Sequence, residues 1–367
     1  MNLENIVSPT LLLDKKKCLN NIQLMTEKAK KHNLIFRPHF KTHQSRVIGK
    51  WFKKFGVDKI TVSSLQMAEY FSNDAWKDIT VAFPVNIREI ETINSLAEET
   101  QLNLTLENTE SVEFLSKELI FEVGFFIKVD TGYGRTGVSF DIFILIDKIL
   151  QLASKSNKLV FKGFLSHSGN TYSAKSTKEI LDIHNDALHK LTLLKNQYIE
   201  KYPDLIMSIG DTPSCSVADN FSEMNEIRPG NFVFYDLTQK RLGSCKLDQI
   251  ATIVACPIVA KHKNRREIII HGGGVHFSKE FLNFNDKKIY GKLVLLNKKG
   301  WEETKQDYYV TKLSQEHGTL EVSGDLFDEL NIGDLIGIVP VHSCLTANLM
   351  KNYISTDDDV IDHLAGS

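Results

Sequence analysis

The segment Arg37–His43, which reads RPHFKTH, contains the residue with the clearest chemical potential in the chain. Lys41 would stand at the end of a buried strand, where a lysine is rarely found without a role. Burial and the neighbouring Arg37 would lower the pKa of the Lys41 amine, because both disfavour its charged form. An uncharged amine attacks carbonyl carbons and forms a Schiff base. The other interpretation is a lysine at a rim whose ammonium extends into water.

Two further segments combine glycine with small polar side chains near expected strand ends. They are Gly210–Ser214, which reads GDTPS, and Arg228–Asn231, which reads RPGN. Backbone N–H groups in such loops bind phosphate, since small residues let the anion approach closely. Each segment alone is equally typical of an ordinary turn. Together with a Schiff-base lysine they indicate a phosphorylated carbonyl compound, which is either pyridoxal phosphate or the sugar phosphate of an aldolase.

Two other expected strand ends carry a cation or rings. Val129–Gly137 (VDTGYGRTG) is a glycine-rich turn in which Arg135 could bind a carboxylate through two hydrogen bonds. No helix follows it at the spacing that a dinucleotide-binding fingerprint requires. Ser166–Tyr172 (SHSGNTY) puts His167 and Tyr172 where they could flank a flat ring. A hydrogen-bonded structural histidine is the other interpretation of His167.

The strongest candidates for metal ligands lie near the C-terminus. If the apolar stretch Leu335–Val341 continues as a strand, His342 and Cys344 project from the same side of it. They would then supply half of a tetrahedral zinc site and leave positions open for substrate and water. Two ligands alone are weak evidence. The segment His271–His276 (HGGGVH) could also contact a metal or a carboxylate, although its glycines are typical of a tight backbone approach.

Eight short apolar segments alternate with helical patterns over the first two thirds of the chain, and polar residues follow most of them. The expected strands are Ile35–Lys41, Lys59–Ser63, Ile79–Phe83, Leu102–Glu107, Phe125–Asp130, Val160–Ser166, Leu205–Ile209 and Phe232–Tyr235. This alternation predicts an α/β fold, a (β/α)8 TIM barrel, with an open doubly wound sheet as the alternative. Barrel enzymes carry their chemistry at the C-terminal ends of the strands, where all these motifs fall.

A barrel takes about 250 residues, so more than one domain is expected in this chain. After Arg241 the pattern changes to strands joined by turns, which predicts an all-β domain. The expected strands there are Ile250–Ala260, Glu267–His271, Lys288–Leu296, Tyr308–Leu313, Thr319–Val322 and Leu335–Val341. We therefore predict a barrel over residues 14–240 and a β domain over residues 241–367. Residues 1–13 are expected to join the second domain through the strand-like Thr10–Leu13.

Composition excludes several classes of protein. The 367 residues include 44 Lys and Arg against 46 Asp and Glu, so the net charge is −2 and a general binder of nucleic acid or membrane surfaces is not expected. No apolar run approaches the ~18 residues of a transmembrane span, and the N-terminus lacks a secretory pattern. The five cysteines form no CxxC pair, which favours free thiols in the cytoplasm.

Four ordered motifs together resemble a known group of enzymes. They are RPHFKTH at Arg37–His43, VDTGYGRTG at Val129–Gly137, IRPGNFVFYD at Ile227–Asp236 and HSCLT at His342–Thr346. The chain is similar, from about Ser8 to its end, to the fold-type III pyridoxal-phosphate enzymes of the alanine racemase type. It most resembles their D-serine dehydratase and D-threonine aldolase branch. The resemblance implies a homodimer whose active sites use both subunits.

The resemblance also implies roles for individual residues. Lys41 would hold pyridoxal 5'-phosphate as a Schiff base and later act as the base at the substrate Cα. His167 would pack on the pyridine ring with Tyr172 beside the cofactor, and Arg228 would face the pyridine nitrogen. The phosphate would be held at Thr212, Gly230 and Asn231, while Arg135 would lie near the cofactor or the substrate.

His342 and Cys344 distinguish the two reactions of this branch. The resemblance implies that dehydratases bind Zn2+ through such a His-x-Cys pair, whereas aldolases pair the histidine with aspartate and prefer harder ions. Cys344 therefore favours a D-serine dehydratase-like lyase that eliminates water from a D-3-hydroxy amino acid to give a keto acid and ammonia. The alternatives are a D-threonine aldolase, an amino-acid racemase and a non-catalytic pyridoxal-phosphate carrier. D-Serine, D-threonine and 3-hydroxyaspartate all fit as substrates.

Overall fold

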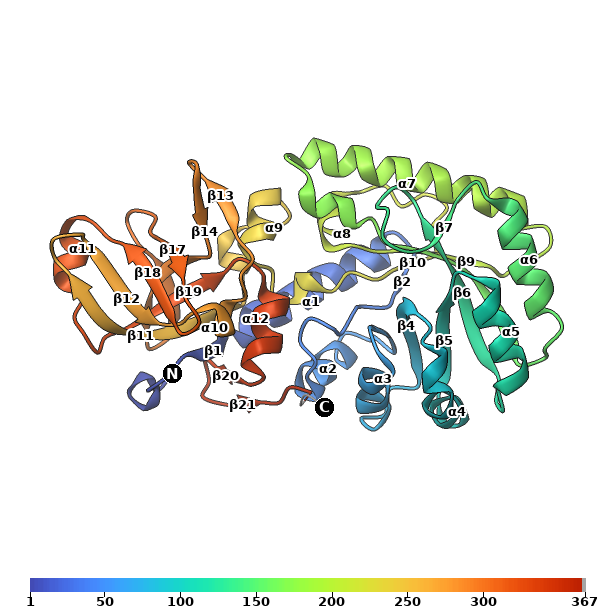
Figure 1. The fold of residues 1–367 in the computed structure, drawn as a ribbon, viewed down its shortest axis with the longest axis horizontal. Coiled ribbons are helices and arrows are strands. Elements are labelled where there is room, and N and C mark those ends of the chain that lie inside the picture. Colours follow the sequence, from blue (N-terminus) through green and yellow to red (C-terminus); the bar gives the residue numbers. More distant parts are fainter. Residues whose placement is uncertain (365–367) are drawn as a thin grey trace.

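Eight parallel strands form a nearly closed barrel in the first part of the chain (Figure 1). The computed structural model describes residues 1–364. Hydrogen-bonded neighbours follow the order β2-β10-β9-β8-β6-β5-β4-β3, and a parallel bridge between His39 and Thr61 joins the two ends. The strands are β2 (Ile35–Phe36), β3 (Lys59–Val62), β4 (Asp78–Pro84), β5 (Gln101–Leu106), β6 (Val123–Asp130), β8 (Leu159–Ser166), β9 (Ile206–Ile209) and β10 (Glu226–Ile227). The barrel prediction is confirmed, and the doubly wound alternative is wrong.

Helices cover the outside of this barrel, and most begin at a side-chain cap. The helices are α1 (Lys15–Lys31), α2 (Arg46–Lys53), α3 (Leu65–Ser72), α4 (Ile90–Glu99), α5 (Thr109–Glu118), α6 (Phe143–Ala153), α7 (Thr177–Tyr198) and α8 (Thr212–Val217). Asn108 caps α5 by accepting a hydrogen bond from Ser111 N at 2.8 Å. Val112 and Leu115 are the buried apolar face of this helix.

The last barrel strand is not where the sequence analysis puts it. Phe232–Tyr235 is wrong as a strand, because η4 (Asn231–Val233) and a turn occupy this segment and β10 precedes it. The apolar run is buried for another reason: Phe232 packs on Phe36, and Phe234 packs on Tyr353 of the second domain. A short apolar run shows burial but not the kind of element. The loop Arg228–Asn231 consequently follows the eighth strand rather than preceding it.

The first barrel strand is shorter than expected but still positions Lys41. β2 ends at Phe36, and Pro38, which has no N–H, interrupts the ladder. The chain nevertheless remains between its neighbours, because His39 N donates to Pro229 O and Phe40 N donates to Thr61 O, both at 2.9 Å. Lys41 therefore leaves the barrel at its C-terminal mouth.

The second domain is a closed antiparallel barrel in which β11 pairs with both β12 and β19. Its strands are β11 (Thr252–His262), β12 (Glu267–His271), β15 (Gly291–Asn297), β17 (Tyr309–Leu313), β18 (His317–Glu321) and β19 (Leu335–Pro340). β16 (Gly300–Glu303) pairs with β15, and β13 (Leu282–Phe284) and β14 (Lys287–Ile289) form a separate hairpin. The expected single strand Lys288–Leu296 is thus divided between β14 and β15.

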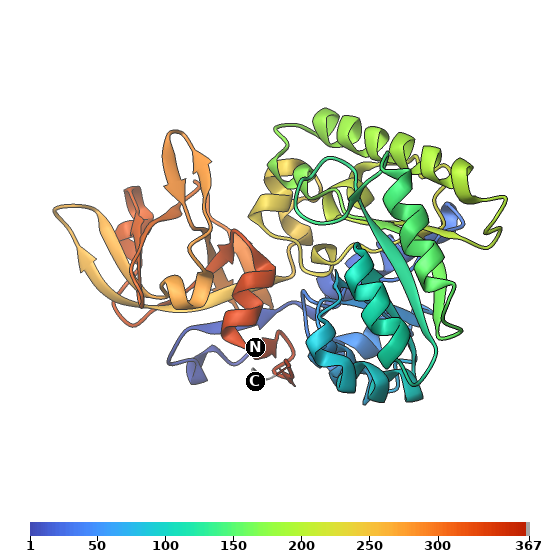
Figure 2. The same cartoon turned by 45° about the vertical axis from the view of Figure 1, so that its right-hand side comes forward.

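Several shorter elements complete this domain and connect it to the barrel. β1 (Thr10–Leu13) pairs with β11 and with β20 (Tyr353–Ser355), which pairs with β21 (Val360–Ile361). The helices are α9 (Leu237–Leu242), α10 (Gly274–Phe277), α11 (Gly324–Glu329) and α12 (Ser343–Met350). Figure 1 and Figure 2 both show α12 on the side of the second domain that faces the barrel.

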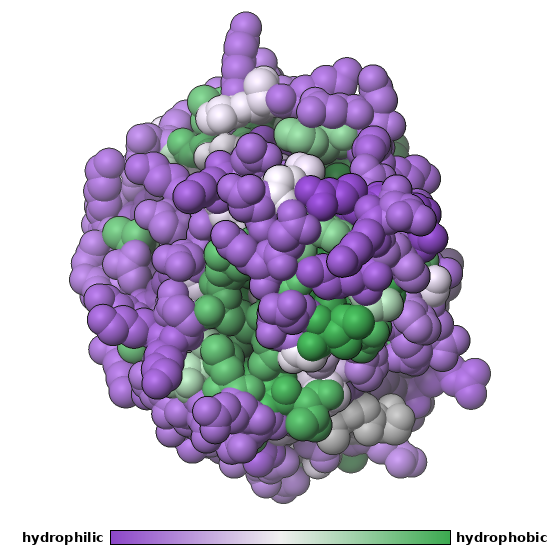
Figure 3. Space-filling view, turned by 90° about the vertical axis from the view of Figure 1, so that its left-hand side faces the viewer, coloured by the Kyte–Doolittle hydropathy of each residue, from purple (hydrophilic) through white to green (hydrophobic). Residues whose placement is uncertain are grey.

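The outer end of the second domain has a mainly hydrophilic surface, and the largest of its apolar areas extends downward from the middle of the view (Figure 3). No helix within residues 1–364 combines the length and apolarity that crossing a bilayer requires. All five cysteines lie in this described part of the chain, and each is a free thiol.

Candidate active site

A cavity of about 670 Å3 lies between the C-terminal mouth of the barrel and the second domain. Side chains from both domains line it, and all ten site residues expected from the sequence are among them. They are Lys41, Arg135, His167, Tyr172, Thr212, Arg228, Gly230, Asn231, His342 and Cys344. Residues up to 303 positions apart in the sequence therefore share one chamber.

Lys41 projects into this cavity, and its surroundings favour the uncharged amine. Enclosure by protein lowers the pKa of the Lys41 ammonium, and the cations Arg135 and Arg228 add to the effect while Cys344 opposes it. Arg37, which the sequence analysis expects to contribute, does not. Its guanidinium points into the barrel, where carboxylates compensate its charge.

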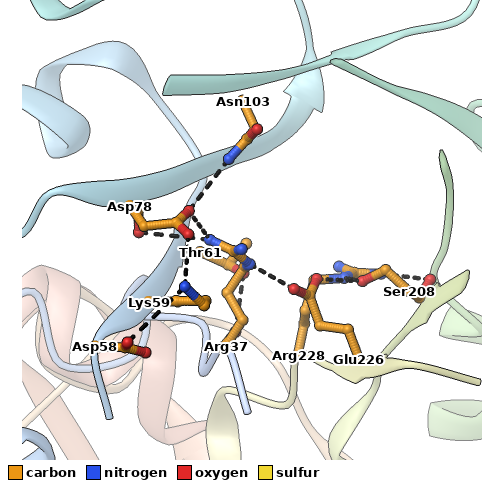
Figure 4. Close-up of polar contacts among 9 residues, drawn as sticks. All are labelled: Arg37, Asp58, Lys59, Thr61, Asp78, Asn103, Ser208, Glu226 and Arg228. Atoms are coloured by element: carbon orange, nitrogen blue, oxygen red, sulfur yellow. Dashed lines mark hydrogen bonds and ion pairs between the residues drawn. The ribbon is translucent and has the colours of Figure 1, made fainter. Parts of the chain in front are cut away.

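The Arg37 guanidinium belongs to a buried polar network inside the barrel (Figure 4). Its Nη1 lies 2.5 Å from Asp78 Oδ1, and its Nε donates to Glu226 Oε2 at 2.7 Å. Glu226 Oε1 accepts from Ser208 Oγ at 2.6 Å, and Ser208 Oγ accepts from Arg228 Nε at 2.6 Å. The Arg228 side chain is therefore held by a continuous chain of hydrogen bonds that begins on the opposite side of the barrel.

Arg228 is fixed at two of its three guanidinium nitrogens. Besides the Nε bond, Nη2 donates to Ser166 O at 2.5 Å. Within the described residues, Nη1 takes part in no hydrogen bond. One donor edge of a buried cation is thus left for a group in the cavity.

His167 and Tyr172 lie side by side on the same wall of the cavity. Their ring centroids are 6.3 Å apart, and the rings are inclined at 45°. His167 Nδ1 bonds to Gly210 O at 2.6 Å, which fixes the ring. Burial is the largest of the causes that lower the pKa of His167 to about 3, so the imidazole is neutral and can pack on a flat ring.

Two loops after the seventh and eighth barrel strands form another part of the wall. Gly210 and Gly230 are required by close packing, because a Cβ at these positions would lie 2.7 Å from Arg228 N and 2.8 Å from His39 O. Within residues 1–364, the buried backbone N–H groups of Gly230 and Asn231 have no acceptor. Unpaired buried N–H groups are rare, and here they mark a place for an anion.

The Asn231 side chain points away from that loop toward the second domain. Its Nδ2 donates to Asp236 Oδ2 at 2.7 Å, to Ser343 Oγ at 3.0 Å and to Cys344 Sγ at 3.4 Å. Ser343 N also donates to Asp236 Oδ2 at 3.0 Å. Asn231 and Asp236 therefore tie the start of α12 to the barrel.

His342 and Cys344 are close neighbours, but not in the way that the sequence predicts. β19 ends at Pro340, His342 is the N-cap residue of α12, and Cys344 lies in its first turn, so the expected shared strand is wrong. Burial alone would lower the pKa of His342, but hydrogen bonds to Cys344 and Glu280 raise it to about 11. Burial would raise the pKa of the Cys344 thiol, but His342 lowers it below its ordinary value.

A second histidine cluster lies in the β domain outside this cavity. His271 Nε2 and His276 Nε2 are each 3.9 Å from Glu316 Oε2. His276 Nδ1 accepts a hydrogen bond from Gly273 N at 3.1 Å, so in the neutral ring the proton is on Nε2. A protonated Nε2 can donate to the carboxylate but cannot bind a metal. Of the two expectations for this segment, the geometry therefore favours the contact with a carboxylate over the metal site.

Several cavity residues are absent from the site expected from the sequence. Among them are His39, Lys128, Asp236 and Glu280. The sequence does contain a signal for Lys128, since a lysine inside the apolar strand β6 is unusual. In the structure, burial and Arg135 lower the pKa of Lys128 to about 8. The sequence contains no signal for Glu280, because Glu280 is 62 positions from His342 in the chain. In the structure its carboxylate lies 2.6 Å from His342 Nδ1.

Comparison with known families agrees with this arrangement. Residues 13–237 match the family "Alanine racemase, N-terminal domain", which is more than half of the chain. The chain belongs to this family. Residues 251–356 match a second family, "Putative serine dehydratase domain". The resemblance to the fold-type III pyridoxal-phosphate enzymes is therefore confirmed, and it extends over both domains.

Individual relatives point to the same branch. The chain is 29% identical to D-serine dehydratase of Dictyostelium discoideum, over 98% of this chain and 96% of that one. It is similar in fold to D-threo-3-hydroxyaspartate dehydratase from Delftia sp. HT23, with a TM-score of 0.89, 21% identity and 99% of each chain covered. D-Threonine aldolase from Filomicrobium marinum gives a TM-score of 0.84 at 19% identity, over 98% and 95% of the two chains. Dehydratases and aldolases are lyases, the enzyme class that the sequence predicts.

Proposed function

We propose that this protein is a pyridoxal-phosphate- and metal-dependent lyase that eliminates water from a D-3-hydroxy amino acid, as a D-serine dehydratase does. The observation that carries the proposal is that one cavity contains Lys41 on the barrel side and the His342–Cys344 pair on the other. A racemase or a simple cofactor carrier has no need of a thiolate and an imidazole opposite its lysine. The dehydratases among the relatives support the same reaction.

The barrel side of the cavity fits pyridoxal phosphate. The unpaired N–H groups of Gly230 and Asn231 suit a phosphate, the neutral His167 ring suits a pyridine face, and the free Nη1 of Arg228 suits a ring nitrogen. Lys41 supplies the amine that the aldehyde needs, and its lowered pKa favours the reactive form.

The second-domain side fits a divalent cation. The His342 imidazole and the Cys344 thiol are hydrogen-bonded, and a metal ion that replaces the proton between them would find a nitrogen and a sulfur ligand. Thiolate and imidazole together favour zinc over harder ions. A variant of the Delftia dehydratase has been solved in a form described as metal-free, which indicates that this relative binds a metal.

The chain's own residues divide the work as follows. When bound, the cofactor accepts the electron pair left at Cα and the metal withdraws charge from the leaving hydroxyl. Lys41 Nζ would take the proton from the substrate Cα. His342 and Cys344 would orient the β-hydroxyl side of the substrate, and Arg228 and His167 would fix the pyridine ring of the cofactor. Loss of one water and hydrolysis of the resulting enamine give one keto acid and one ammonia.

Product analysis tests this proposal directly. The purified holoenzyme is incubated with D-serine and, separately, with D-threonine, and keto acid, ammonia and glycine are measured. Keto acid and ammonia in equal amounts from D-serine support the dehydratase. Glycine and acetaldehyde from D-threonine would assign an aldolase instead. If neither set of products forms while the protein shows the absorbance of a lysine Schiff base, the proposed reaction is wrong and the proposed cofactor stands.

The homodimer and the cytoplasmic location that the sequence analysis expects stay predictions. Size-exclusion chromatography with light scattering checks the first, since a dimer has twice the mass of the chain.

A further inference from the structure

The carboxylate of Glu280 lies behind the proposed metal ligand His342. Glu280 Oε2 is 2.6 Å from His342 Nδ1, a short hydrogen bond. The bond uses the ring nitrogen on one side of the imidazole and leaves Nε2 as the nitrogen available to a cation beside Cys344. Histidines that bind metals commonly donate their second ring N–H to a carboxylate in this way, which fixes the ring and makes it a better ligand.

We propose that Glu280 is a positioning residue that orients His342 and sets the metal affinity of the site. This inference rests on the proposed function, because it requires His342 and Cys344 to bind a metal. A neutral imidazole that donates from Nδ1 has its lone pair on Nε2, and this is the tautomer that a metal ligand needs. Glu280 selects that tautomer without contacting the metal itself.

The segment that carries Glu280 is held at both ends. On one side, α10 is anchored to α12, since Phe277 is fully buried and its carbonyl accepts from Thr346 Oγ1 at 3.5 Å. Ser278 then turns the chain with φ of 70°, and its Oγ accepts from Glu280 N at 3.2 Å. On the other side, Phe281 packs on Tyr290 with ring centroids 6.2 Å apart. The Glu280 backbone therefore has a fixed position relative to His342.

The second histidine cluster provides a matched contrast in the same domain. Glu316 has nearly the same exposed side-chain fraction as Glu280, 46% against 51%. It lies 3.9 Å from two imidazoles, beyond hydrogen-bond distance, and it does not line the cavity. A general loss of negative charge or of surface contacts would affect the two positions alike, whereas orientation of His342 concerns Glu280 only.

The test compares Glu280→Ala, Glu280→Gln and Glu316→Ala in the full-length holoenzyme. Zn2+ affinity is measured by competition with a chromophoric chelator at one fixed pH. We expect Glu280→Ala to weaken Zn2+ binding by about 10- to 100-fold. Glu280→Gln retains an acceptor and should fall between wild type and Glu280→Ala, and Glu316→Ala should match wild type.

Three further readouts separate orientation from a structural effect. An exposed ion pair contributes little to stability, so the thermal midpoint of Glu280→Ala should lie within about 2 °C of wild type. Its lysine Schiff-base absorbance should be unchanged. Its activity should return toward the wild-type value when Zn2+ is raised, with a half-saturating concentration shifted by the same factor as the affinity.

His342→Ala distinguishes failure of this inference from failure of the proposed function. If His342→Ala loses Zn2+ and Glu280→Ala binds it as tightly as wild type, Glu280 does not position the ligand and the inference is wrong. If His342→Ala binds Zn2+ as tightly as wild type, the pair is not the metal site, and the proposed function and the inference fail together.

Discussion

The two domains contribute to the shared cavity in different ways. Barrel residues such as Lys41, His167 and Arg228 stand at strand ends, and Arg228 is held by a buried network that crosses the barrel. The second domain contributes His342 and Glu280 from connecting segments, with side chains that are 30% and 51% exposed. In the proposed function, the barrel-side groups hold the cofactor and the second-domain groups hold the metal. Substitutions on the two sides of the cavity should therefore impair the protein in different ways.

The largest effect is expected from Lys41 on the barrel side. Lys41→Ala removes both the Schiff-base amine and the proposed base, so turnover should fall by at least about 10³-fold for every substrate. The visible absorbance of the lysine Schiff base should disappear, while Zn2+ still binds. Lys117→Ala, on the exposed side of α5, is the control and should behave as wild type. Substantial turnover by Lys41→Ala would assign the amine and the base to another residue.

A change in the second domain should separate the two sides. Cys344→Ala removes one proposed metal ligand, and we expect elimination from D-serine to fall by about 10²- to 10³-fold because the leaving hydroxyl loses its Lewis acid. The Schiff-base absorbance should remain, which it does not in Lys41→Ala. Cys344→Asp should shift the preferred ion from Zn2+ toward Mn2+ or Mg2+, measured by metal analysis after dialysis. Loss of the Schiff base in Cys344→Ala would show that the two sides are not independent.

The buried network makes the barrel side sensitive in stability as well. Glu226 is fully buried and bonds to Arg37 and Ser208. Glu226→Gln leaves part of the Arg37 charge uncompensated and should lower the free energy of unfolding by about 3 kcal/mol. Its counterpart in the second domain is Glu321→Gln, which breaks an exposed pair with Lys287 and should cost less than about 1 kcal/mol. Denaturant unfolding measures both, and equal losses would contradict the contrast between the domains.

Acid should weaken the same network. Burial alone would raise the pKa of Asp78, but the Arg37 guanidinium outweighs it and holds that pKa below its ordinary value. A carboxyl whose pKa is lower in the folded state stabilises the protein above its unfolded pKa, and this contribution is lost as the pH falls through the folded pKa. The free energy of unfolding should therefore fall between about pH 5 and pH 2. Asp78→Asn should show a smaller fall, and an unchanged slope would contradict the assignment.

The smallest effect is expected at a barrel position that does not line the cavity. Asn108→Ala removes the N-cap of α5 and should lower the free energy of unfolding by about 1 kcal/mol. Turnover and Zn2+ affinity should equal those of wild type when both proteins are folded. A change in either would mean that the site depends on the outer helices and not only on the strand ends and α12.

The sequence predicts the barrel well because its strands are continuous apolar runs between helices with clear caps. Asn108 at the start of α5 is one example, and the fully apolar Phe125–Ile127 within β6 is another. The sequence does not predict the eighth strand, β10, for a physical reason. Glu226 is a buried acidic residue in a two-residue strand, and only its partners Arg37 and Ser208, which are distant in the sequence, make it acceptable there.

The candidate site is predicted to a similar extent. The motifs identify ten residues that the structure brings to one cavity, and their roles stay predictions. What the sequence misses are contacts between distant segments. Asp236 and Glu280 act through α12 and His342, and no local pattern indicates that these segments meet. The wrong expectation for Arg37 has the same origin, because its proximity to Lys41 in the sequence gives no information about the direction of its side chain.

In the proposed function, the barrel amine and the second-domain metal pair act on one substrate. The most direct test removes the metal from wild-type holoenzyme with a chelator, verifies its loss by metal analysis, and follows D-serine turnover and Schiff-base absorbance in the same sample. We expect that keto acid formation stops, the absorbance remains, and added Zn2+ restores turnover. Undiminished keto acid formation by the metal-free protein would contradict it.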